Sequence, residues 1–234
     1  KNSKLIWFHA ASVGEMISII PIINELKKNN DKFEFLITTV TLSSGNLIKK
    51  KFQDCNNIHH RYFPLDVGFL IQNFIKMWKP NIVFFVDSEI WPNLILNLKD
   101  KKIPISVING RLTKKSFKRW KILSSLAYKI FSKFDLILTS NIESKNYFAE
   151  LGGKNILHLG NIKFSNKIDF TTSKNINEKN LSLKNVWCAA STHDNEEYFC
   201  IKTHIKLRKK ISNLLTIIIP RHIERSDQIK KICL

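Results

Sequence analysis

Short apolar segments alternate with helical patterns along most of this chain, and this alternation most constrains the fold that it can adopt. The segments expected to form strands lie at residues 5–9, 33–39, 58–63, 82–86, 105–108, 136–139 and 156–159. Helical spacing of apolar residues fills the intervals, at 15–28, 45–52, 67–78, 90–98, 114–131 and 142–151. Continuous apolar strands joined by helices are typical of a parallel sheet that is covered on both faces. We therefore expect an α/β fold of the Rossmann-like kind.

The alternation is interrupted once and then resumes. Residues 165–184 are rich in Asn, Ser, Thr and Lys and lose the apolar period, as an interdomain linker does. A strand at 185–189, a helix at 195–209 and a strand at 214–219 follow. One strand–helix–strand unit does not complete a Rossmann-like domain, which usually has about five or six strands. We expect a first domain at 1–164, a linker at 165–184 and an incomplete second domain at 185–234.

The charge balance of the chain is strongly basic. Lys and Arg number 38 against 19 Asp and Glu, which gives a formal net charge of +19, while 44% of the 234 residues are hydrophobic and can form a sizeable core. Such an excess predicts an anionic partner, which can be nucleic acid, an acidic membrane face or a phosphorylated substrate. A general bias toward Lys and Asn would explain the same excess, because many of the lysines fall on solvated helix faces and loops.

The four cysteines and the apolar runs exclude several classes of protein. Cys55, Cys188, Cys200 and Cys233 form no close pair, which argues against a zinc site or a dithiol redox motif and fits reduced thiols. No His, Asp or Glu spacing indicates another metal site. No stretch reaches the roughly 18 consecutive apolar residues of a spanning helix, and the first apolar run is too short for a signal peptide. The chain starts almost on its first strand, so we expect that a preceding segment has been lost or removed.

A carboxylate stands where the first strand is expected to turn into a helix. The apolar run at 5–8 leads into the letters HAASVGE, in which Ser12 and Gly14 precede Glu15. Small residues let the backbone turn tightly and leave the helix N-terminus open to a ligand. A Glu in the first helical turn at the mouth of a parallel sheet can face the place where such folds bind substrates. The alternative is that the helix dipole alone favours an acid here.

A second acidic site follows the strand at 82–86, in the letters DSEIWPN. We expect Glu89 on the same sheet edge as Glu15, where the two carboxylates can share a cleft. The alternative is helix capping, with Asp87 or Ser88 as the N-cap and Pro92 in the first turn. Capping does not account for the aromatic residue and the Asn in this cluster, so we expect capping and a functional role together.

Basic residues follow the next strand. Asn109 and Arg111 lie at a helix entrance, where an Arg can meet a phosphate or a carboxylate. The expected helix then carries five Lys and Arg residues between positions 114 and 121, interleaved with Phe117 and Trp120. This pattern suits an anionic membrane surface or lipid phosphates. A surface Arg and an ordinary amphipathic surface helix are the alternatives.

Further candidates lie on either side of the expected linker. Lys163 ends the first half and would point into an interdomain cleft, where it can neutralise a leaving phosphate. In the second half, two turns follow strands and place hydroxyls and N–H donors at the mouth of the second sheet. The alternatives are a Ser/Thr cap with acidic first-turn residues, and ordinary surface histidines. The candidate binding residues at these two turns are Ser191, Thr192, Pro220, Arg221 and His222.

Taken in order, eight segments of the chain resemble the 3-deoxy-D-manno-octulosonic acid (Kdo) transferases of lipopolysaccharide synthesis. They read HAASVGE, TTVTLSSG, FPLD, DSEIWPN, NGRL, LGG with GNIKF, WCAASTHDNEE and IIPRHIER. Each is weak alone, but eight in series over almost the whole chain are specific. The resemblance implies an inverting glycosyltransferase with two Rossmann-like domains of GT-B type, the second truncated here. It also implies transfer of Kdo from CMP-Kdo to a lipid A precursor, without a cofactor, at the cytoplasmic face of the inner membrane.

The resemblance also assigns roles to single residues. It implies that Glu15 is the catalytic base and that Glu89 and Lys163 stabilise the transition state. Pro220 and Arg221 match the motif that binds CMP in this family. The acceptor is then expected in the first domain and the CMP group in the second.

The donor half departs from the family pattern. Ile223 stands where the family usually has a second Pro, although the turn at 191–193 matches a Ser-Thr-His motif that we expect near the donor. The later CMP-binding motifs and the usual N-terminal membrane-associated segment have no counterpart in these residues. We therefore expect little or no activity from the 234 residues alone, and a membrane association that is peripheral or provided by a segment absent here.

Two other classes of protein stay open. One is another GT-B sugar-nucleotide enzyme, such as a UDP-sugar transferase or epimerase, which would differ in its choice of donor. The other is a basic nucleic-acid-binding protein, which needs exposed stacking aromatics among its basic residues. Most aromatic residues here lie in apolar strand and helix runs, so we expect no nucleic-acid partner.

Overall fold

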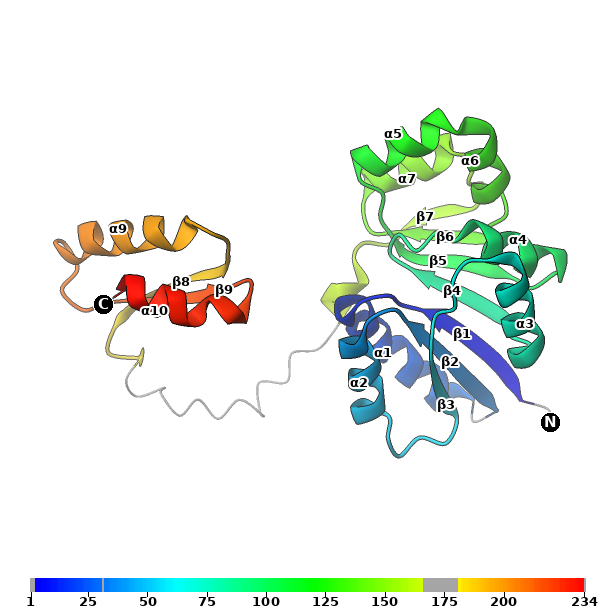
Figure 1. Cartoon of the computed structure of the whole chain (residues 1–234), viewed down its shortest axis with the longest axis horizontal. Helices are drawn as coiled ribbons and strands as arrows, with labels where there is room; N and C mark the ends of the chain where they lie inside the picture. The colour runs from blue at the N-terminus through cyan, green and yellow to red at the C-terminus, as the bar shows by residue number, and fades with distance from the viewer. Residues whose placement is uncertain (1–2, 31, 166–180, 234) are drawn as a thin grey trace. The chain divides into compact units, whose positions relative to one another are not determined.

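The structure is a computed structural model that describes residues 3–30, 32–165 and 181–233 (Figure 1). Its internal contacts divide the chain into two compact units, Lys1–Lys167 and Ile168–Leu234. Most of the segment at 165–184, which the sequence predicts to be a linker, lies outside the described residues.

The first unit is built on a sheet of seven strands, as the apolar segments predict. The strands are β1 (Lys4–His9), β2 (Phe33–Thr39), β3 (Ile58–Tyr62), β4 (Ile82–Val86), β5 (Ile105–Gly110), β6 (Leu136–Thr139) and β7 (Ile156–His158). They lie in the order β3-β2-β1-β4-β5-β6-β7, and each neighbouring pair is parallel. The strand order reverses between β1 and β4. Sheets of this kind bind ligands at the carboxyl ends of the strands, where the order reverses.

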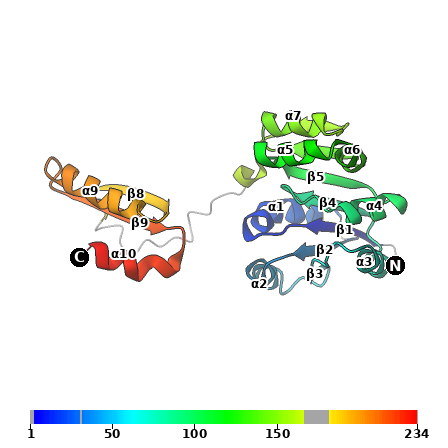
Figure 2. The ribbon, with the colours of Figure 1, turned by 45° about the horizontal axis from the view of Figure 1, so that its top comes forward.

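Helices cover both faces of this sheet, with α1 and α2 on one side and α3 and α4 on the other (Figure 2). The helices are α1 (Val13–Asn29), α2 (Leu42–Lys51), α3 (Gly68–Trp78), α4 (Pro92–Asp100), α5 (Lys114–Ile122), α6 (Ser124–Phe131) and α7 (Ile142–Glu150), and the 3-10 turn η1 (Ile162–Ser165) follows β7. Within β1, Ile6 and Phe8 belong to the buried cluster that includes residues of α1 and α2, whereas Leu5 and Trp7 belong to the cluster that includes residues of α3 to α7. Burial on both sides explains why β1 reads as one continuous apolar run.

Two helix predictions need correction. The single helix expected at 114–131 is two helices, α5 and α6, which are separated at Leu123. The backbone of Leu123, with φ −103° and ψ 48°, lies outside the helical region, so no continuous helix passes through it. The helix expected from residue 45 begins earlier, because the Thr41 side chain accepts a hydrogen bond from the Ser44 N–H and caps α2.

The second unit contains a parallel pair of strands. β8 (Asn185–Thr192) and β9 (Leu214–Pro220) are joined by α9 (Glu196–Arg208), which confirms the strand–helix–strand pattern. The turn η3 (Ile223–Arg225) and the helix α10 (Ser226–Cys233), which the apolar pattern does not predict, follow β9. Because β8 and β9 are parallel, the turns after them lie at one edge. Within the described ranges, no helix has the length and apolar character needed to cross a bilayer.

Candidate active site

Four segments that the sequence singles out come together at the carboxyl edge of the first sheet. They follow or end β1, β4, β5 and β7, and they contribute Glu15, Glu89, Asn109 and Lys163. β1 and β4 are the neighbours at which the strand order reverses. The parallel connections therefore place both carboxylates at the position where sheets of this class bind their ligands.

The turn from β1 into α1 holds the Glu15 carboxylate with two hydrogen bonds. Its Oε2 accepts a hydrogen bond from the Ala11 N–H at 2.8 Å, and its Oε1 accepts one from the Ser12 hydroxyl at 2.7 Å. Ser12 Oγ in turn accepts one from the Glu15 N–H at 3.4 Å. Ser12, predicted to bind substrate, is thus the N-cap of α1. Gly14 faces open space, since a Cβ at this position would meet nothing within 4 Å.

Burial raises the pKa of Glu15 above its ordinary value of 4.5. The hydrogen bonds from Ser12 and Ala11 oppose that rise, and the negative charges of Glu89 and Asp87 add to it. A carboxylate with a raised pKa is a stronger base, which suits removal of a proton from a hydroxyl group. The helix-dipole explanation for Glu15 requires neither the burial nor the neighbouring acids.

Glu89 is held by contacts with two ring side chains. Its Oε2 lies 3.3 Å from Nε2 of His9 and accepts a hydrogen bond from Nε1 of Trp91 at 2.9 Å. His9 is fully buried, whereas the side chain of Glu89 is 21% exposed. The carboxylate is therefore anchored from the protein interior while it stays accessible. Sequence reasoning missed His9, although it opens the segment HAASVGE.

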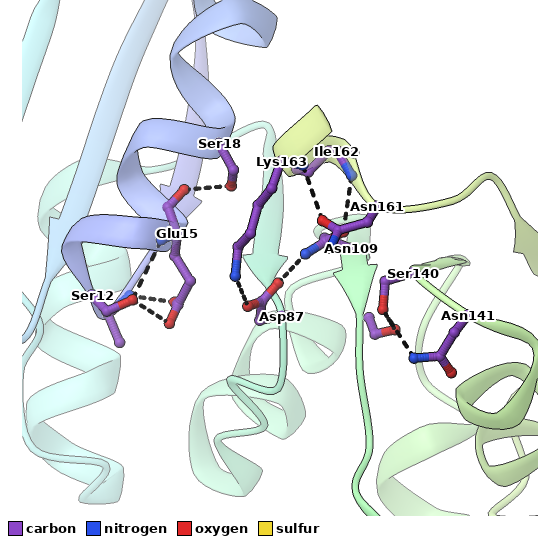
Figure 3. Close-up of polar contacts among 12 residues, drawn as sticks. Ser12, Glu15, Ser18, Asp87, Asn109, Ser140, Asn141, Asn161, Ile162 and Lys163 are labelled. Carbon is purple, nitrogen blue, oxygen red and sulfur yellow. Dashed lines mark hydrogen bonds and ion pairs between the residues drawn. The ribbon is translucent and has the colours of Figure 1, made fainter. Parts of the chain in front are cut away.

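Lys163 reaches the same region through an ion pair, and Figure 3 shows its side chain extending from η1 toward Asp87, alongside Glu15. Its Nζ lies 3.0 Å from Oδ2 of Asp87. The other oxygen of Asp87 accepts a hydrogen bond from the Asn109 amide, whose oxygen accepts one from the Ile162 N–H at 3.1 Å. These contacts tie η1 to the ends of β4 and β5. They hold the ammonium group at the edge that carries the two acids.

Asp87 and Asn109 both adopt left-handed backbone conformations. Their φ angles are 56° and 57°, which cost a non-glycine residue roughly 1–3 kcal/mol each. Asn109, predicted to bind substrate, is buried, and its amide is engaged by Asp87 and Ile162. The structure therefore gives Asn109 a positioning role. Arg111 is exposed beside this edge, and its N–H donates to the Asp87 carbonyl at 3.4 Å.

The predicted caps of α4 are wrong. α4 begins at Pro92, which does lie in the first turn, but neither Asp87 nor Ser88 caps it. Instead, the carboxylate of Asp66 accepts hydrogen bonds at 3.0 and 2.8 Å from the two backbone N–H groups that follow Pro92. With the cap supplied by Asp66, the Asp87 carboxylate pairs with Lys163. The sequence analysis did not predict the contact between Asp87 and Lys163. The feature that could have indicated it is the position of Asp87 directly after β4, at the same sheet edge as Glu15 and Glu89.

This arrangement provides groups for base catalysis and for charge stabilisation within one edge of the sheet. A carboxylate with a raised pKa can accept a proton, and a second carboxylate and an ammonium group can balance charge that develops beside it. In the described part of the chain, no three or more His, Cys, Asp or Glu side chains gather in a way that would hold a metal ion.

In the second unit, an ion pair joins the first turn of α9 to η3. The two oxygens of Glu197 accept hydrogen bonds from the Arg225 guanidinium at 2.8 and 2.9 Å, and Glu197 is only 2% exposed. The Thr192 hydroxyl donates to Glu197 at 2.7 Å, and the Thr192 carbonyl accepts from the Arg221 N–H at 2.9 Å. The hydroxyl of Thr192, predicted to lie near the donor, is thus engaged inside this network.

The remaining donor candidates lie at the same edge of the second unit. Ser191, Arg221 and His222 are exposed, and Pro220 is half-buried at the end of β9. Neither predicted hydroxyl caps α9, whose N-cap is Asn195 without a side-chain hydrogen bond. The acidic first turn of α9 is present as predicted.

The pair of Glu197 and Arg225 is expected to make the second unit sensitive to acid. Hydrogen bonds from Arg225 lower the pKa of Glu197 from 4.5 to about 2, against the effect of burial. Because the folded-state pKa is lowered, the stabilisation is complete above pH 4.5 and is lost as the pH falls toward about 2. We expect the urea midpoint of this unit, followed by fluorine NMR of fluorotryptophan at Trp187, to fall over that range. In Glu197→Gln the midpoint should be lower near neutral pH and should lack this dependence.

Glu196→Gln is the matched control for that experiment. Glu196 is the exposed neighbour of Glu197 and accepts a hydrogen bond from the His193 N–H at 2.8 Å. This variant should keep the pH dependence of the unchanged protein. A flat profile in the unchanged protein would contradict the contribution of Glu197.

Comparison with known proteins identifies a family for the chain. The family profile described as "3-Deoxy-D-manno-octulosonic-acid transferase (kdotransferase)" matches residues 1–166. The chain is 35% identical to the 3-deoxy-D-manno-octulosonic acid transferase of Haemophilus influenzae, covering 97% of this chain and 55% of that protein. It is 32% identical to the protein of the same name from Rickettsia bellii, covering 100% of this chain and 56% of that protein. The chain thus spans about half the length of the curated relatives that it matches.

Solved structures share the fold at low sequence identity. The UDP-GlcNAc 2-epimerase of Neisseria meningitidis bound to UDP-GlcNAc matches with a TM-score of 0.65 and 17% identity, over 98% of this chain and 69% of that one. A putative UDP-N-acetylglucosamine 2-epimerase from Listeria monocytogenes matches with a TM-score of 0.66 and 12% identity, over 98% of this chain and 64% of that one. These likenesses concern the fold alone, and they confirm the Rossmann-like GT-B architecture that the sequence predicts.

Proposed function

Because the chain belongs to the 3-deoxy-D-manno-octulosonic acid (Kdo) transferase family, we propose that it carries catalytic groups of an inverting glycosyltransferase. The proposed reaction moves Kdo from CMP-Kdo to a lipid A precursor in lipopolysaccharide synthesis and needs no cofactor. One observation supports it above the others: Glu15, Glu89 and the Lys163–Asp87 pair meet at the edge where the strand order reverses.

In the proposed reaction, Glu15 is the general base. An acceptor hydroxyl attacks the anomeric carbon of Kdo and loses its proton to Glu15, whose raised pKa favours the transfer. The sugar passes through an oxocarbenium-like state while the bond to CMP breaks and CMP leaves as an anion. Because Glu15 acts as a base and not as a nucleophile, the reaction is a single displacement that inverts the anomeric centre.

Glu89 and Lys163 are proposed to balance the charges that develop. Glu89 orients the acceptor or stabilises positive charge on the sugar, and Lys163 offsets negative charge on the leaving phosphate. The residues proposed to bind the CMP group are Ser191, Thr192, Pro220, Arg221 and His222.

Exposed apolar side chains near the site support a lipid acceptor. They lie in the loops and first helical turns that follow β2, β3, β6 and β7, at the same edge as Glu15. Apolar surface beside a polar site is typical of proteins that bind lipids or membranes. The exposed residues of this kind are Leu42, Leu65, Phe69, Ile142 and Phe164.

The choice of donor tests this proposal against a UDP-sugar enzyme of the same fold. In calorimetric titrations of the complete gene product, we expect CMP and CMP-Kdo to compete for one site and UDP-GlcNAc not to bind. Transfer of labelled Kdo to a lipid A precursor should continue in the presence of EDTA. Binding of the UDP-sugar instead would favour a transferase or epimerase of that class. Salt-sensitive DNA binding without donor affinity would favour a nucleic-acid-binding protein.

We also propose that α5 rests on the anionic cytoplasmic face of the inner membrane. Lys115, Lys118 and Arg119 are exposed on this helix, and Ile122 and Leu123 are exposed at its end. Basic residues beside exposed apolar side chains attract anionic bilayers, at about 1 kcal/mol for each Lys or Arg near the surface.

Charge reversal on α5 should therefore release the protein from anionic vesicles. Lys118→Glu combined with Arg119→Glu should weaken binding to phosphatidylglycerol vesicles by at least about 10-fold in sedimentation assays. Lys50→Glu combined with Lys51→Glu changes the net charge equally on the exposed end of α2 and serves as the control. Equal losses in the two variants would show that net charge, and not α5, governs the binding.

A further inference from the structure

A buried hydrogen-bond chain leads from the core of the first sheet to Glu89. Nε1 of Trp7 donates to Oγ1 of Thr38 at 2.8 Å, and that oxygen lies 2.9 Å from Nδ1 of His9. Nε2 of His9 lies 3.3 Å from Oε2 of Glu89. Trp7, Thr38 and His9 are all fully buried, so each polar atom of the chain depends on its protein partners.

The donors and acceptors of this chain select one tautomer of His9. An indole N–H only donates, so the Thr38 oxygen accepts from Trp7 and keeps its own proton to donate. Among the described residues, the Thr38 hydroxyl makes hydrogen bonds to Trp7 and His9 only. Its proton therefore goes to Nδ1 of His9, and the imidazole proton lies on Nε2, facing Glu89. In the opposite tautomer Nε2 would accept a hydrogen bond from Nε1 of Trp91, which lies 3.0 Å away and also donates to Glu89. That tautomer, however, would leave the buried Thr38 proton without an acceptor, and this unpaired buried proton decides between the two.

Ring contacts and a second donor fix the geometry around Glu89. The Phe63 ring lies 4.2 Å from the imidazole of His9 between centroids. Nε1 of Trp91 lies within hydrogen-bond distance of both Oε2 of Glu89, at 2.9 Å, and Nε2 of His9, at 3.0 Å. With the proton of His9 on Nε2, the indole N–H and the imidazole N–H both point to Oε2 of Glu89. The other oxygen, Oε1, has no hydrogen-bond partner among the described residues. Glu89 thus has one oxygen bound to the protein and one available to a ligand.

We propose that His9 is a positioning residue of the transferase reaction. Its Nε2–H, set by Trp7 and Thr38, holds Oε2 of Glu89 and leaves Oε1 to face the reacting groups. This role rests on the function proposed for Glu89, whereas the tautomer of His9 does not depend on it. Because Thr38 stands beside His9 in the register of β1 and β2, the sheet itself orients the carboxylate.

The tautomer can be read directly by NMR. In the 234-residue chain with labelled histidine, a long-range proton–nitrogen spectrum near neutral pH should show the His9 proton on Nε2, and His9→Gln assigns the signal by its loss. A proton on Nδ1, or on both nitrogens, overturns the inference. Thr38→Val should shift the Nδ1 signal, because that nitrogen loses its donor. Thr39→Val is the matched control, since the neighbouring hydroxyl pairs with His60 on β3 and its loss should leave His9 unchanged.

Measurements of transferase activity distinguish a positioning role of His9 from a purely structural role in the core. In the complete gene product, His9→Gln keeps an N–H donor near the place of Nε2, whereas His9→Asn is too short to reach Glu89. We expect kcat to fall about 10-fold further in His9→Asn than in His9→Gln, with KM for CMP-Kdo little changed. Equal losses of kcat in the two variants overturn the positioning role. Normal transfer by Glu89→Gln would overturn the function proposed for Glu89 and the positioning role with it, whichever tautomer is observed.

Discussion

Glu15→Gln is expected to lower kcat for Kdo transfer by about 10²–10⁴-fold while the protein stays folded. A general base must accept the proton of the acceptor hydroxyl, and an amide cannot. Gln keeps the size of the side chain and can still bond to Ala11 and Ser12, so the cap of α1 and the thermal unfolding temperature should change little. The measurement is transfer of labelled Kdo by the complete gene product. Near-normal transfer by Glu15→Gln would contradict the assignment of Glu15 as the general base.

Glu143→Gln provides the matched control for this variant. Glu143 also lies in the first turn of a helix, α7, at the same edge of the sheet, and its Oε1 accepts a hydrogen bond from the Tyr147 hydroxyl at 2.6 Å. If the helix dipole alone accounted for acids at first turns, the Glu15 and Glu143 variants would behave alike. We expect activity to be lost only in Glu15→Gln.

The dependence of kcat/KM on pH tests the role of Glu15 without a substitution at that position. Burial raises the pKa of Glu15 above 4.5, and protonation abolishes its action as a base. The value of kcat/KM should therefore fall as the pH drops through the raised pKa, with a midpoint above 4.5. Glu89→Gln removes a negative charge that contributes to the rise, so in its residual activity this midpoint should move to lower pH. A midpoint that moves to higher pH would contradict the assignment.

Apolar periodicity was sufficient to predict the sheet, because its central strands are buried on both faces. β1 is buried at every residue from Leu5 to His9, so it reads as a continuous apolar run and not as an alternation. The placement of Glu15 and Glu89 at one edge follows from the same pattern, since each follows a strand of a parallel sheet. The break at Leu123 was not predictable from periodicity, because α5 and α6 bury apolar residues in the same core.

The partners of the polar side chains depend on contacts between distant segments, and local rules could not give them. Asp87 fits the rule for a helix cap, but the cap of α4 comes from Asp66, which stands 27 residues before Asn93. A histidine inside an apolar strand fits an ordinary core position. His9 acquires its hydrogen-bond role only when the pairing of β1 with β2 sets Thr38 beside it. The site could thus be located from the sequence, while the groups that orient it could not.

Lys163→Met should produce the other large effect, a loss of about 10²–10³-fold in kcat with almost no loss of stability. The ion pair between Lys163 and Asp87 is partly exposed, with the two side chains 41% and 16% accessible. Exposed ion pairs contribute only about 1 kcal/mol or less to folding, so the pair does little to explain why the structure holds this ammonium group at the site. Its proposed action is on negative charge that develops on the phosphate as the bond between the sugar and the phosphate breaks. Rates of Kdo transfer and urea unfolding should therefore respond differently to the substitution.

Lys99→Met tests whether loss of a similar ion pair elsewhere has the same consequence. Nζ of Lys99 lies 2.9 Å from Asp135, which directly precedes β6 and so lies at the opposite, amino edge of the sheet. Both variants remove one lysine from one carboxylate pair and keep a side chain of similar length. Removal of a charge that acts on the transition state should lower kcat only in Lys163→Met. If Lys163→Met instead lost stability in proportion to activity, the ammonium group would serve to hold η1 against β4, and another cation would have to neutralise the leaving phosphate.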